Sequence, residues 1–206
     1  KKELLPTGTC LILITPDSER TMFTYLGIAG KINDVDINEK TLQESDMIFL
    51  EGYLWDEGEP QKAFNKAIKY SNKVAMTLSD KFCVDRHRVN FLELVRHKLD
   101  ITFANEQEMI SLIEAKNFDD VITFAKELKK LVVITRGEKG AIAIFGEKTV
   151  EVGVKKNLNI IDLTGAGDLF AAGFLHGYIN GLPTKDSLEK GAELSSKIIQ
   201  KMGARL

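Results

Sequence analysis

The sequence predicts an α/β fold in which a mainly parallel sheet lies between layers of helices. Two observations carry this prediction. Short apolar runs with the composition of strands alternate with segments whose apolar residues recur at helical spacing, over most of the 206 residues. A glycine-rich turn also stands directly before an apolar helix near the carboxyl end. In sheets of this kind, ligands bind beyond the carboxyl ends of the strands, so turns at those ends are the first places to search for a site.

The chain opens with a predicted β-hairpin. Residues 9–15 and 20–26 are rich in β-branched and aromatic side chains, and Pro16-Asp17-Ser18-Glu19 between them has the composition of a turn. Residues 1–30 are therefore expected to form a lid-type or edge hairpin. The sequence begins with Lys1 rather than methionine and runs almost directly into the first strand, so we expect a further segment upstream.

Strands and helices then alternate. Further strands are expected at residues 47–50, 74–78, 101–104 and 131–135, with a second hairpin at 141–145 and 149–152. Helices are expected at residues 60–71, from a cap at Asp85, at 106–115, at 118–130, from the glycine-rich turn to about 180, and from a cap at Thr184. No internal repeat or linker interrupts this order, so residues 1–206 are expected to form a single domain.

Composition excludes several classes of protein. The 28 basic and 30 acidic residues are interleaved, which gives a net charge of -2 and no positive stripe for nucleic acid. Two cysteines and three histidines are scattered without ligand spacing, which argues against a disulfide framework and against a thiolate or histidine metal site. No apolar run approaches the roughly 20 residues that span a bilayer, and the amino end does not read as a signal peptide. We expect a cytoplasmic protein without nucleic-acid or membrane partners.

The glycine-rich turn is the strongest candidate site. Gly165, Ala166 and Gly167 can turn successive N–H groups toward one point, where the positive end of the following helix also attracts an anion such as phosphate. Asp168 would then stand where a phosphate arrives, placed to accept a proton from an attacking hydroxyl. The alternative is a purely structural turn with an aspartate that only caps the helix. The P-loop pattern is absent from the chain, and Phe170 occupies the third glycine position of the dinucleotide fingerprint.

Several separated motifs resemble one family. The run Asp162-x-Thr164-Gly165-Ala166-Gly167-Asp168 is similar to the carboxyl-terminal signature of ribokinase-like (PfkB) sugar and nucleoside kinases. Asn105-Glu106-Gln107-Glu108 resembles the Asn-x-x-Glu motif of that family, and Thr135-Arg136-Gly137-Glu138-Lys139-Gly140 resembles its nucleotide loop. The amino-terminal hairpin and Leu78-Ser79-Asp80 look most like the adenosine-kinase-like branch. The resemblance covers essentially the whole chain, with the motifs in the family's order.

The resemblance implies a three-layer αβα sandwich, ATP and Mg²⁺ as cofactors, and a role for each motif. Asp168 would be the base, with the amides of Gly165, Ala166 and Gly167 stabilising the transferred phosphoryl group. Thr135, Gly137 and Gly140 would line the nucleotide. Asn105 and Glu108 would hold Mg²⁺ through water, although from the residues alone this pair reads as a solvated first helical turn. Asp162 and Thr164 match positions beside a monovalent-cation site, which would take K⁺.

The resemblance also leaves alternatives open. The Gly-Gly-x-x-x-Asn segment that encloses the sugar in this family is absent, as is an asparagine near the base, where Gly191-Ala192-Glu193 stands. The favoured substrate is adenosine-like; a ketohexose or ketogluconate kinase and a catalytically silent nucleotide-binding fragment are the alternatives. The apolar hairpin residues Leu11, Leu13, Met22 and Tyr25 would suit a lid over the sugar or the contact of a homodimer. The plainer alternative is an edge hairpin packed on its own core.

Overall fold

The computed structural model describes residues 5–55 and 58–206 of the chain. These residues divide into two compact units. One unit contains Tyr25–Val133 and Ile144–Lys148, and the other contains Cys10–Thr24, Ile134–Ala143 and Thr149–Leu206. The single domain expected for residues 1–206 stays a prediction. Among the described residues, none of the helices has the length and apolar character needed to cross a membrane.

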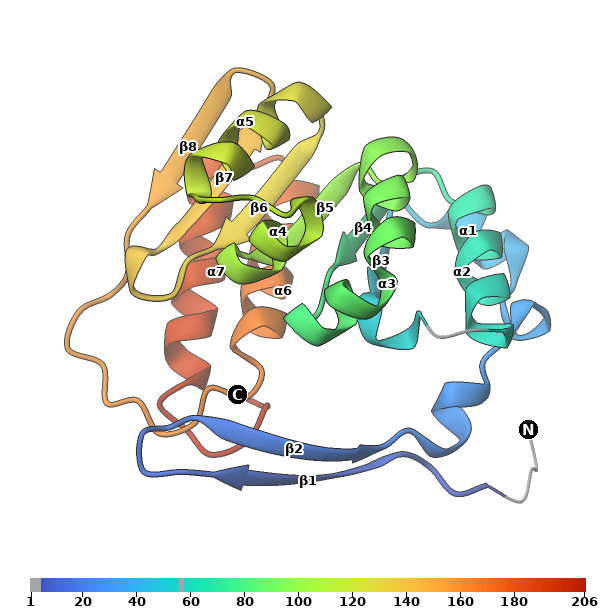
Figure 1. Ribbon diagram of the computed structural model, residues 1–206, viewed down its shortest axis with the longest axis horizontal. Coiled ribbons are helices and arrows are strands. Elements are labelled where there is room, and N and C mark those ends of the chain that lie inside the picture. The colour runs from blue at the N-terminus through green and yellow to red at the C-terminus, as the bar shows by residue number, and fades with distance from the viewer. Residues whose placement is uncertain (1–4, 56–57) are drawn as a thin grey trace. The chain divides into compact units, whose positions relative to one another are not determined.

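The first unit is built from alternating strands and helices (Figure 1). Its elements are α1 (Glu39–Glu44), β3 (Ile48–Glu51), α2 (Glu59–Tyr70), β4 (Val74–Thr77), α3 (Lys81–Glu93), β5 (Ile101–Asn105), α4 (Glu106–Ile113) and α5 (Phe118–Leu128). Short helical turns occur at Gly27–Lys31, Asp34–Asp36, Gly52–Leu54 and Leu94–Lys98. The predicted alternation is therefore present, and the polar stretch after the first hairpin contains short helices as well.

Later strands of the described residues form a six-stranded sheet in the order β3-β4-β5-β6-β7-β8, where β6 is Leu131–Thr135, β7 is Ala141–Phe145 and β8 is Lys148–Val152. β4 pairs in parallel with β3 on one side and with β5 on the other, with Ala75 opposite Phe49 and Ile101. Val74, Ala75 and Met76 are all buried, because a parallel strand covered on both faces needs a continuous apolar run rather than an alternating one.

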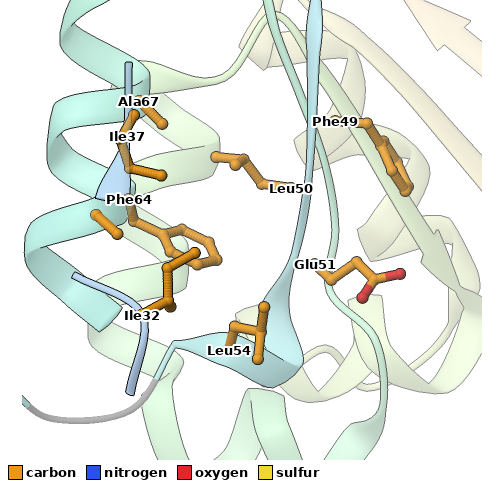
Figure 2. A pocket seen from close by; sticks show the side chains of 9 residues that line it. Ile32, Ile37, Phe49, Leu50, Glu51, Leu54, Phe64 and Ala67 are labelled. Carbon is orange, nitrogen blue, oxygen red and sulfur yellow. The ribbon is translucent and has the colours of Figure 1, made fainter. Parts of the chain in front are cut away.

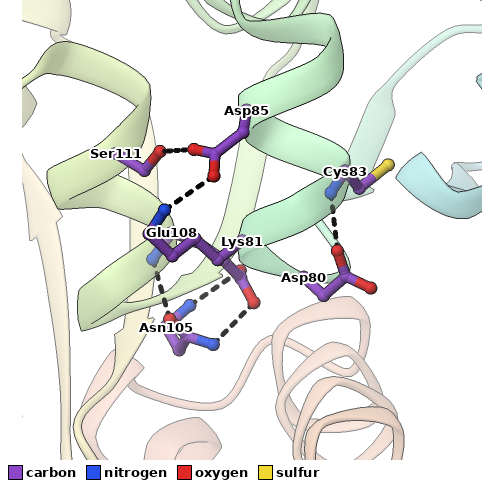
Figure 3. A network of polar contacts seen from close by, with 7 residues as sticks. All are labelled: Asp80, Lys81, Cys83, Asp85, Asn105, Glu108 and Ser111. Carbon is purple, nitrogen blue, oxygen red and sulfur yellow. Dashed lines mark hydrogen bonds and ion pairs between the residues drawn. The ribbon is translucent and has the colours of Figure 1, made fainter. Parts of the chain in front are cut away.

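Side-chain caps fix where the helices of the first unit begin. Asp80 caps α3 by accepting the N–H of Cys83 at 2.6 Å, so the predicted cap at Asp85 is wrong. Asp85 lies one turn inside α3 and bonds to Lys81 at 2.6 Å and to the hydroxyl of Ser111 (Figure 3). The chain reaches Asp80 through Ser79, whose positive φ of 77° is rare for a residue with a side chain. The turn after β4 therefore starts the helix earlier than apolar spacing suggests.

In the second unit, α6 (Ala166–Ile179) and α7 (Thr184–Ile198) pack side by side at very short range (Figure 1). Glycines make this approach feasible. A Cβ added at Gly173 would lie 2.6 Å from the carbonyl oxygen of Lys190, and one at Gly191 would lie 2.7 Å from that of Phe170. Because α6 is held this closely, its amino-terminal turn has a fixed position within the unit.

The first hairpin, β1 (Thr9–Ile14) and β2 (Arg20–Tyr25), forms a two-stranded sheet of its own. The N–H of Thr15 donates to the carbonyl of Glu19 at 2.9 Å, and Cys10 Sγ lies 3.2 Å from Thr24 Oγ1 across the strands. Its large apolar side chains, including Leu11, Leu13, Met22 and Tyr25, are exposed. Ile12 and Ile14 of β1 are half-buried, and the choice between a lid, a dimer contact and an edge hairpin stays a prediction.

Candidate active site

The glycine-rich corner opens helix α6 in the second unit. Gly165 is the N-cap residue, with φ of 80° in the left-handed region that favours glycine. The first helical bond runs from the N–H of Leu169 to the carbonyl of Gly165 at 2.9 Å. Among the described residues, the N–H groups of Gly167 and Asp168 have no acceptor. The N–H of Ala166 donates instead to the carbonyl of Leu163 at 3.2 Å, so this one of the three predicted amides is already bonded within the chain.

Asp168 stands in the first turn of α6, at the positive end of the helix. Its side chain is exposed, and no hydrogen bond or ion pair ties the carboxylate to another described residue. A carboxylate with both oxygens available can accept a proton from a hydroxyl that approaches the helix end. This geometry fits the predicted base, whose role stays a prediction.

Asp162 is buried behind the corner, with 1% of its surface exposed. Its Oδ1 accepts the N–H of Thr164 at 2.8 Å, and its Oδ2 accepts the N–H of Gly203 at 2.8 Å. Burial works to raise the pKa of this carboxyl, but the hydrogen bonds from Thr164 and Gly203 and the charge of Arg20 hold the pKa below its ordinary value. Asp162 is therefore a charged residue that ties the corner to the carboxyl-terminal segment.

The hydroxyl of Thr164 differs from the rest of this cluster. The residue is 7% exposed. Its Oγ1 makes no hydrogen bond of acceptable geometry among the described residues, although the hydroxyl lies close enough to the Asp162 carboxylate to help lower the pKa of that group. A buried hydroxyl without a partner is unfavourable, so this atom is available to a ligand or an ion.

The predicted nucleotide loop follows β6. Thr135 ends the strand, and the N–H of Arg136 donates to the carbonyl of Gly140 at 2.8 Å, which closes a compact turn. Gly137 and Gly140 have φ of 55° and 89°. A Cβ at Gly140 would lie 2.0 Å from the carbonyl oxygen of Val152, whereas one at Gly137 would meet nothing within 4 Å. Gly140 is therefore required by packing, while Gly137 is exposed and open to a ligand.

Asn105 and Glu108 form a capping box at the end of β5 in the first unit (Figure 3). The Asn105 side chain accepts the N–H of Glu108 at 2.8 Å. In return, Glu108 accepts the Asn105 N–H at 2.9 Å and its Nδ2 at 2.6 Å. Asn105 is exposed but Glu108 is only 4% exposed, so the interpretation as a solvated helical turn is wrong for Glu108. Burial is the main cause that raises the pKa of Glu108, the charge of Asp80 adds to it, and together they bring the pKa to about 7 against the opposing hydrogen bonds from Asn105.

Asp80 is the residue that sequence reasoning missed. It lies at the start of α3, after β4, and its charge acts on Glu108, which follows the neighbouring strand β5. The signal was present, because an aspartate three residues before Cys83 has the spacing of an N-cap. Whether this group and the corner at Asp168 make up one site stays a prediction, since they lie in different compact units.

A sequence profile described as pfkB family carbohydrate kinase matches residues 1–206. The chain belongs to the pfkB family of carbohydrate kinases. The family recognised from the motifs is thereby confirmed.

Adenosine kinases are among the pfkB family proteins to which this chain is similar. Its structure resembles that of the adenosine kinase from Sinorhizobium meliloti with a TM-score of 0.94 and 37% identity, over 98% of this chain and 63% of that one. The chain is 28% identical to the adenosine kinase of Dictyostelium discoideum over 97% of its own length and 64% of that protein. A 5-dehydro-2-deoxygluconokinase of Geobacillus thermodenitrificans is 26% identical over 82% of this chain and 54% of its own length.

The predicted fold class is confirmed, because the chain has the ribokinase-like α/β fold with a mostly parallel sheet. It spans less than two thirds of each of these three relatives. Its kinship with sugar and nucleoside kinases follows from the family.

Proposed function

We propose that the chain is the larger part of an ATP-dependent kinase that phosphorylates a hydroxyl of a sugar or nucleoside, with an adenosine-like substrate favoured. The observation that carries the proposal is the first turn of α6. Its amides at Gly167 and Asp168 have no acceptor in the described chain, and the Asp168 carboxylate beside them is exposed. Phosphoryl transfer requires hydrogen-bond donors that stabilise charge on the transferred phosphoryl group. It also requires a base that accepts the proton of the attacking hydroxyl.

ATP would lie against the loop formed by Thr135, Gly137 and Gly140. Gly137 supports this assignment, because it is exposed with open space where a side chain would stand, so a flat ligand can approach the backbone. Mg²⁺ would be held by Asn105 and Glu108. Their donors are oxygens, which suits this ion, and because both Glu108 oxygens already accept hydrogen bonds, the contact would run through water. When bound, Mg²⁺ neutralises charge on the phosphates.

A monovalent cation such as K⁺ would lie beside Asp162 and Thr164. The buried Thr164 hydroxyl without a partner supports this part of the proposal, since it is an oxygen ligand available next to a charged carboxylate. We further propose a cytoplasmic location and a homodimer that forms through the exposed apolar face of the hairpin.

Analytical ultracentrifugation of the Leu11→Asp variant tests the homodimer. If this variant associates as strongly as the wild-type protein, the homodimer is contradicted.

The decisive experiment measures phosphate transfer to adenosine in the protein extended upstream to the length of its relatives. Asp168→Asn should lower kcat by about 10²–10⁴-fold, which is the usual contribution of a positioned base. Asp119→Asn is the matched control, because Asp119 is also exposed in the first turn of a helix, α5, outside the candidate site. Activity of Asp168→Asn close to that of the control would contradict the proposal.

Two alternatives have specific support. The 5-dehydro-2-deoxygluconokinase relative favours a ketohexose or ketogluconate-type sugar kinase, which a substrate panel run beside adenosine would reveal. The shortness of the chain relative to its relatives favours a catalytically silent nucleotide-binding fragment. Extended protein that binds MgATP but transfers phosphate to no sugar or nucleoside would establish the silent alternative.

A further inference from the structure

Two lysines, Lys98 and Lys130, lie at the end of the sheet where β5 and β6 begin. Lys98 ends the helical turn Leu94–Lys98, just before β5, and Lys130 stands between α5 and β6. The N–H of Leu131 donates to the carbonyl of Asp100 at 3.2 Å, so the two neighbouring strands start at the same level. Both lysines therefore belong to one rim of the first unit, at the opposite end of β5 from the candidate magnesium pair.

The turn that carries Lys98 is packed against the helix that leads to Lys130. The guanidinium of Arg96 lies over the ring of Phe124 on α5, 5.6 Å from its centroid. Lys129 then ends α5 in the left-handed conformation, with φ of 53°, and Lys130 follows it into β6. These contacts hold the two lysines at neighbouring positions on the rim.

The Lys130 ammonium is half-buried without a bonded partner. Among the described residues, it makes no hydrogen bond or ion pair. The carboxylate whose charge acts on it is that of Asp100, but Asp100 Oδ2 accepts the N–H of Val74 at 2.8 Å. The charge of Lys98 also acts on Lys130, as a like charge. A half-buried ammonium beside a second ammonium is unfavourable.

Lys66 is a half-buried lysine with the opposite surroundings. It stands on α2 next to Ala67, which lines an apolar pocket of about 250 Å³ (Figure 2). The Nζ of Lys66 donates to the carbonyl of Asp34 at 3.0 Å and pairs with Glu39 at 3.2 Å. Lys66 and Lys130 are both half-buried, so the difference between them is the partner of the ammonium.

These surroundings make the amine of Lys130 a better nucleophile than an ordinary surface lysine. Partial burial is the main cause that lowers the pKa of Lys130, Asp100 opposes the shift, and Lys98 adds to it. A larger share of the amine is then neutral near pH 8, and only the neutral amine attacks an electrophile. Lys98 is exposed beside it, and its charge attracts an anionic reagent.

We propose that Lys130 is a site of acylation by acyl phosphates, with Lys98 as the group that attracts their phosphate. The neutral Nζ of Lys130 attacks the acyl carbon, a C–N bond forms, and the C–O bond to the phosphate breaks. The phosphate leaves with the proton that the nitrogen gives up, so the products are an amide and inorganic phosphate. Because the amide is neutral, acylation removes the like-charge repulsion at the rim.

Mass spectrometry of the 206-residue chain after brief incubation with acetyl phosphate at pH 8 tests the proposal. The initial rate of acetylation at Lys130 should exceed the rates at Lys66 and Lys40 by at least about 3-fold. Lys66 controls for burial, and Lys40, whose side chain is 80% exposed, controls for access. In urea the three rates should converge, because the difference belongs to the fold. A rate at Lys130 no greater than that at Lys40 in the folded chain would overturn the proposal.

Two variants with opposite expected effects test the charges. Lys98→Gln should slow acetylation of Lys130 at least about 3-fold relative to Lys66, because the attracting cation is lost. Asp100→Asn should accelerate it, and asparagine keeps an oxygen for the N–H that Asp100 holds. Lys62→Gln, at an exposed lysine of α2, is the matched control and should leave the ratio unchanged. An unchanged ratio in Lys98→Gln, or slower acetylation in both charge variants, would overturn the proposal.

This readout is independent of the proposed kinase activity, because the amide is detected directly on the chain. A chain that transfers no phosphate to any alcohol would still show the preference for Lys130. Conversely, equal acetylation of all three lysines would leave the kinase proposal untouched and reject this one.

Discussion

Asn105 and Glu108 bind each other through three hydrogen bonds between 2.6 and 2.9 Å, and this pairing keeps a buried carboxylate at the end of β5. Two of these bonds, from the N–H and the Nδ2 of Asn105, donate to the Glu108 carboxylate, and they would ordinarily favour the charged form of the acid. Burial and the charge of Asp80 outweigh them, so the pKa of Glu108 rises from 4.5 to about 7. The box is therefore both a helix cap and a group that titrates near neutral pH.

The first prediction concerns the pH dependence of folding. Because the pKa of Glu108 is raised in the folded state, the native chain binds more protons than the unfolded chain between pH 4.5 and about 7. The contribution of Glu108 to the free energy of unfolding should therefore fall as pH rises through that window, by about 3 kcal/mol at most. Urea unfolding of wild type and Glu108→Gln at several pH values in this window measures the change. The Glu108→Gln variant should not show the fall in unfolding free energy that is due to Glu108. Identical pH slopes in the two proteins would contradict the raised pKa.

This pair also shows how far sequence reasoning reaches. An asparagine at a strand end with glutamate three residues later has the spacing of a capping box, so its position was predictable. Burial of Glu108 was not, because it depends on the packing of a helix that begins 25 residues earlier in the sequence than Asn105, at Asp80. The sequence also did not reveal where that helix starts. Its start depends on a left-handed backbone conformation at Ser79, and composition does not predict this conformation for serine.

The second prediction concerns the contact between α6 and α7. Gly173→Ala would place a Cβ 2.6 Å from the carbonyl oxygen of Lys190, so the helices must separate, at a cost of about 1–3 kcal/mol. Gly167→Ala is the control in the same helix, where a Cβ meets nothing within 4 Å and alanine should stabilise by up to about 1 kcal/mol. Denaturant midpoints of the two variants should move in opposite directions. Equal loss in both would contradict the assignment of the Gly173 effect to its contact with Lys190.

The third prediction separates the two glycines of the loop after β6. Gly140→Ala combines a φ of 89° with a Cβ 2.0 Å from the Val152 carbonyl oxygen, so it should cost about 3 kcal/mol or more. Gly137→Ala has a φ of 55° but open space, so strain alone should cost about 1–2 kcal/mol. Thermal unfolding should rank them in this order. The reverse ranking would mean that the loop is not packed against β8 as the structure has it.

The fourth prediction concerns Asp162, which joins the glycine-rich corner to the carboxyl-terminal segment. Each of its carboxylate oxygens accepts one backbone N–H, from Thr164 and from Gly203. Asp162→Asn retains one acceptor and turns an NH₂ group toward the other N–H, so a buried donor is left without a partner. The expected loss is about 1–3 kcal/mol at pH 7. Asp46→Asn, at an exposed aspartate, is the control and should change stability little.

The pH dependence of the Asp162 variant distinguishes charge from packing. The pKa of Asp162 lies below 3.8 in the folded chain, so its contribution is fully present above that pH and is lost as pH falls through the lower folded value. The difference in stability between wild type and Asp162→Asn should therefore be constant from pH 7 to about 4 and shrink in stronger acid. Urea unfolding in that acid range measures the difference. A gap that stays unchanged down to the acid limit of folding would mean that shape, rather than the charged carboxylate, holds Gly203 against the corner.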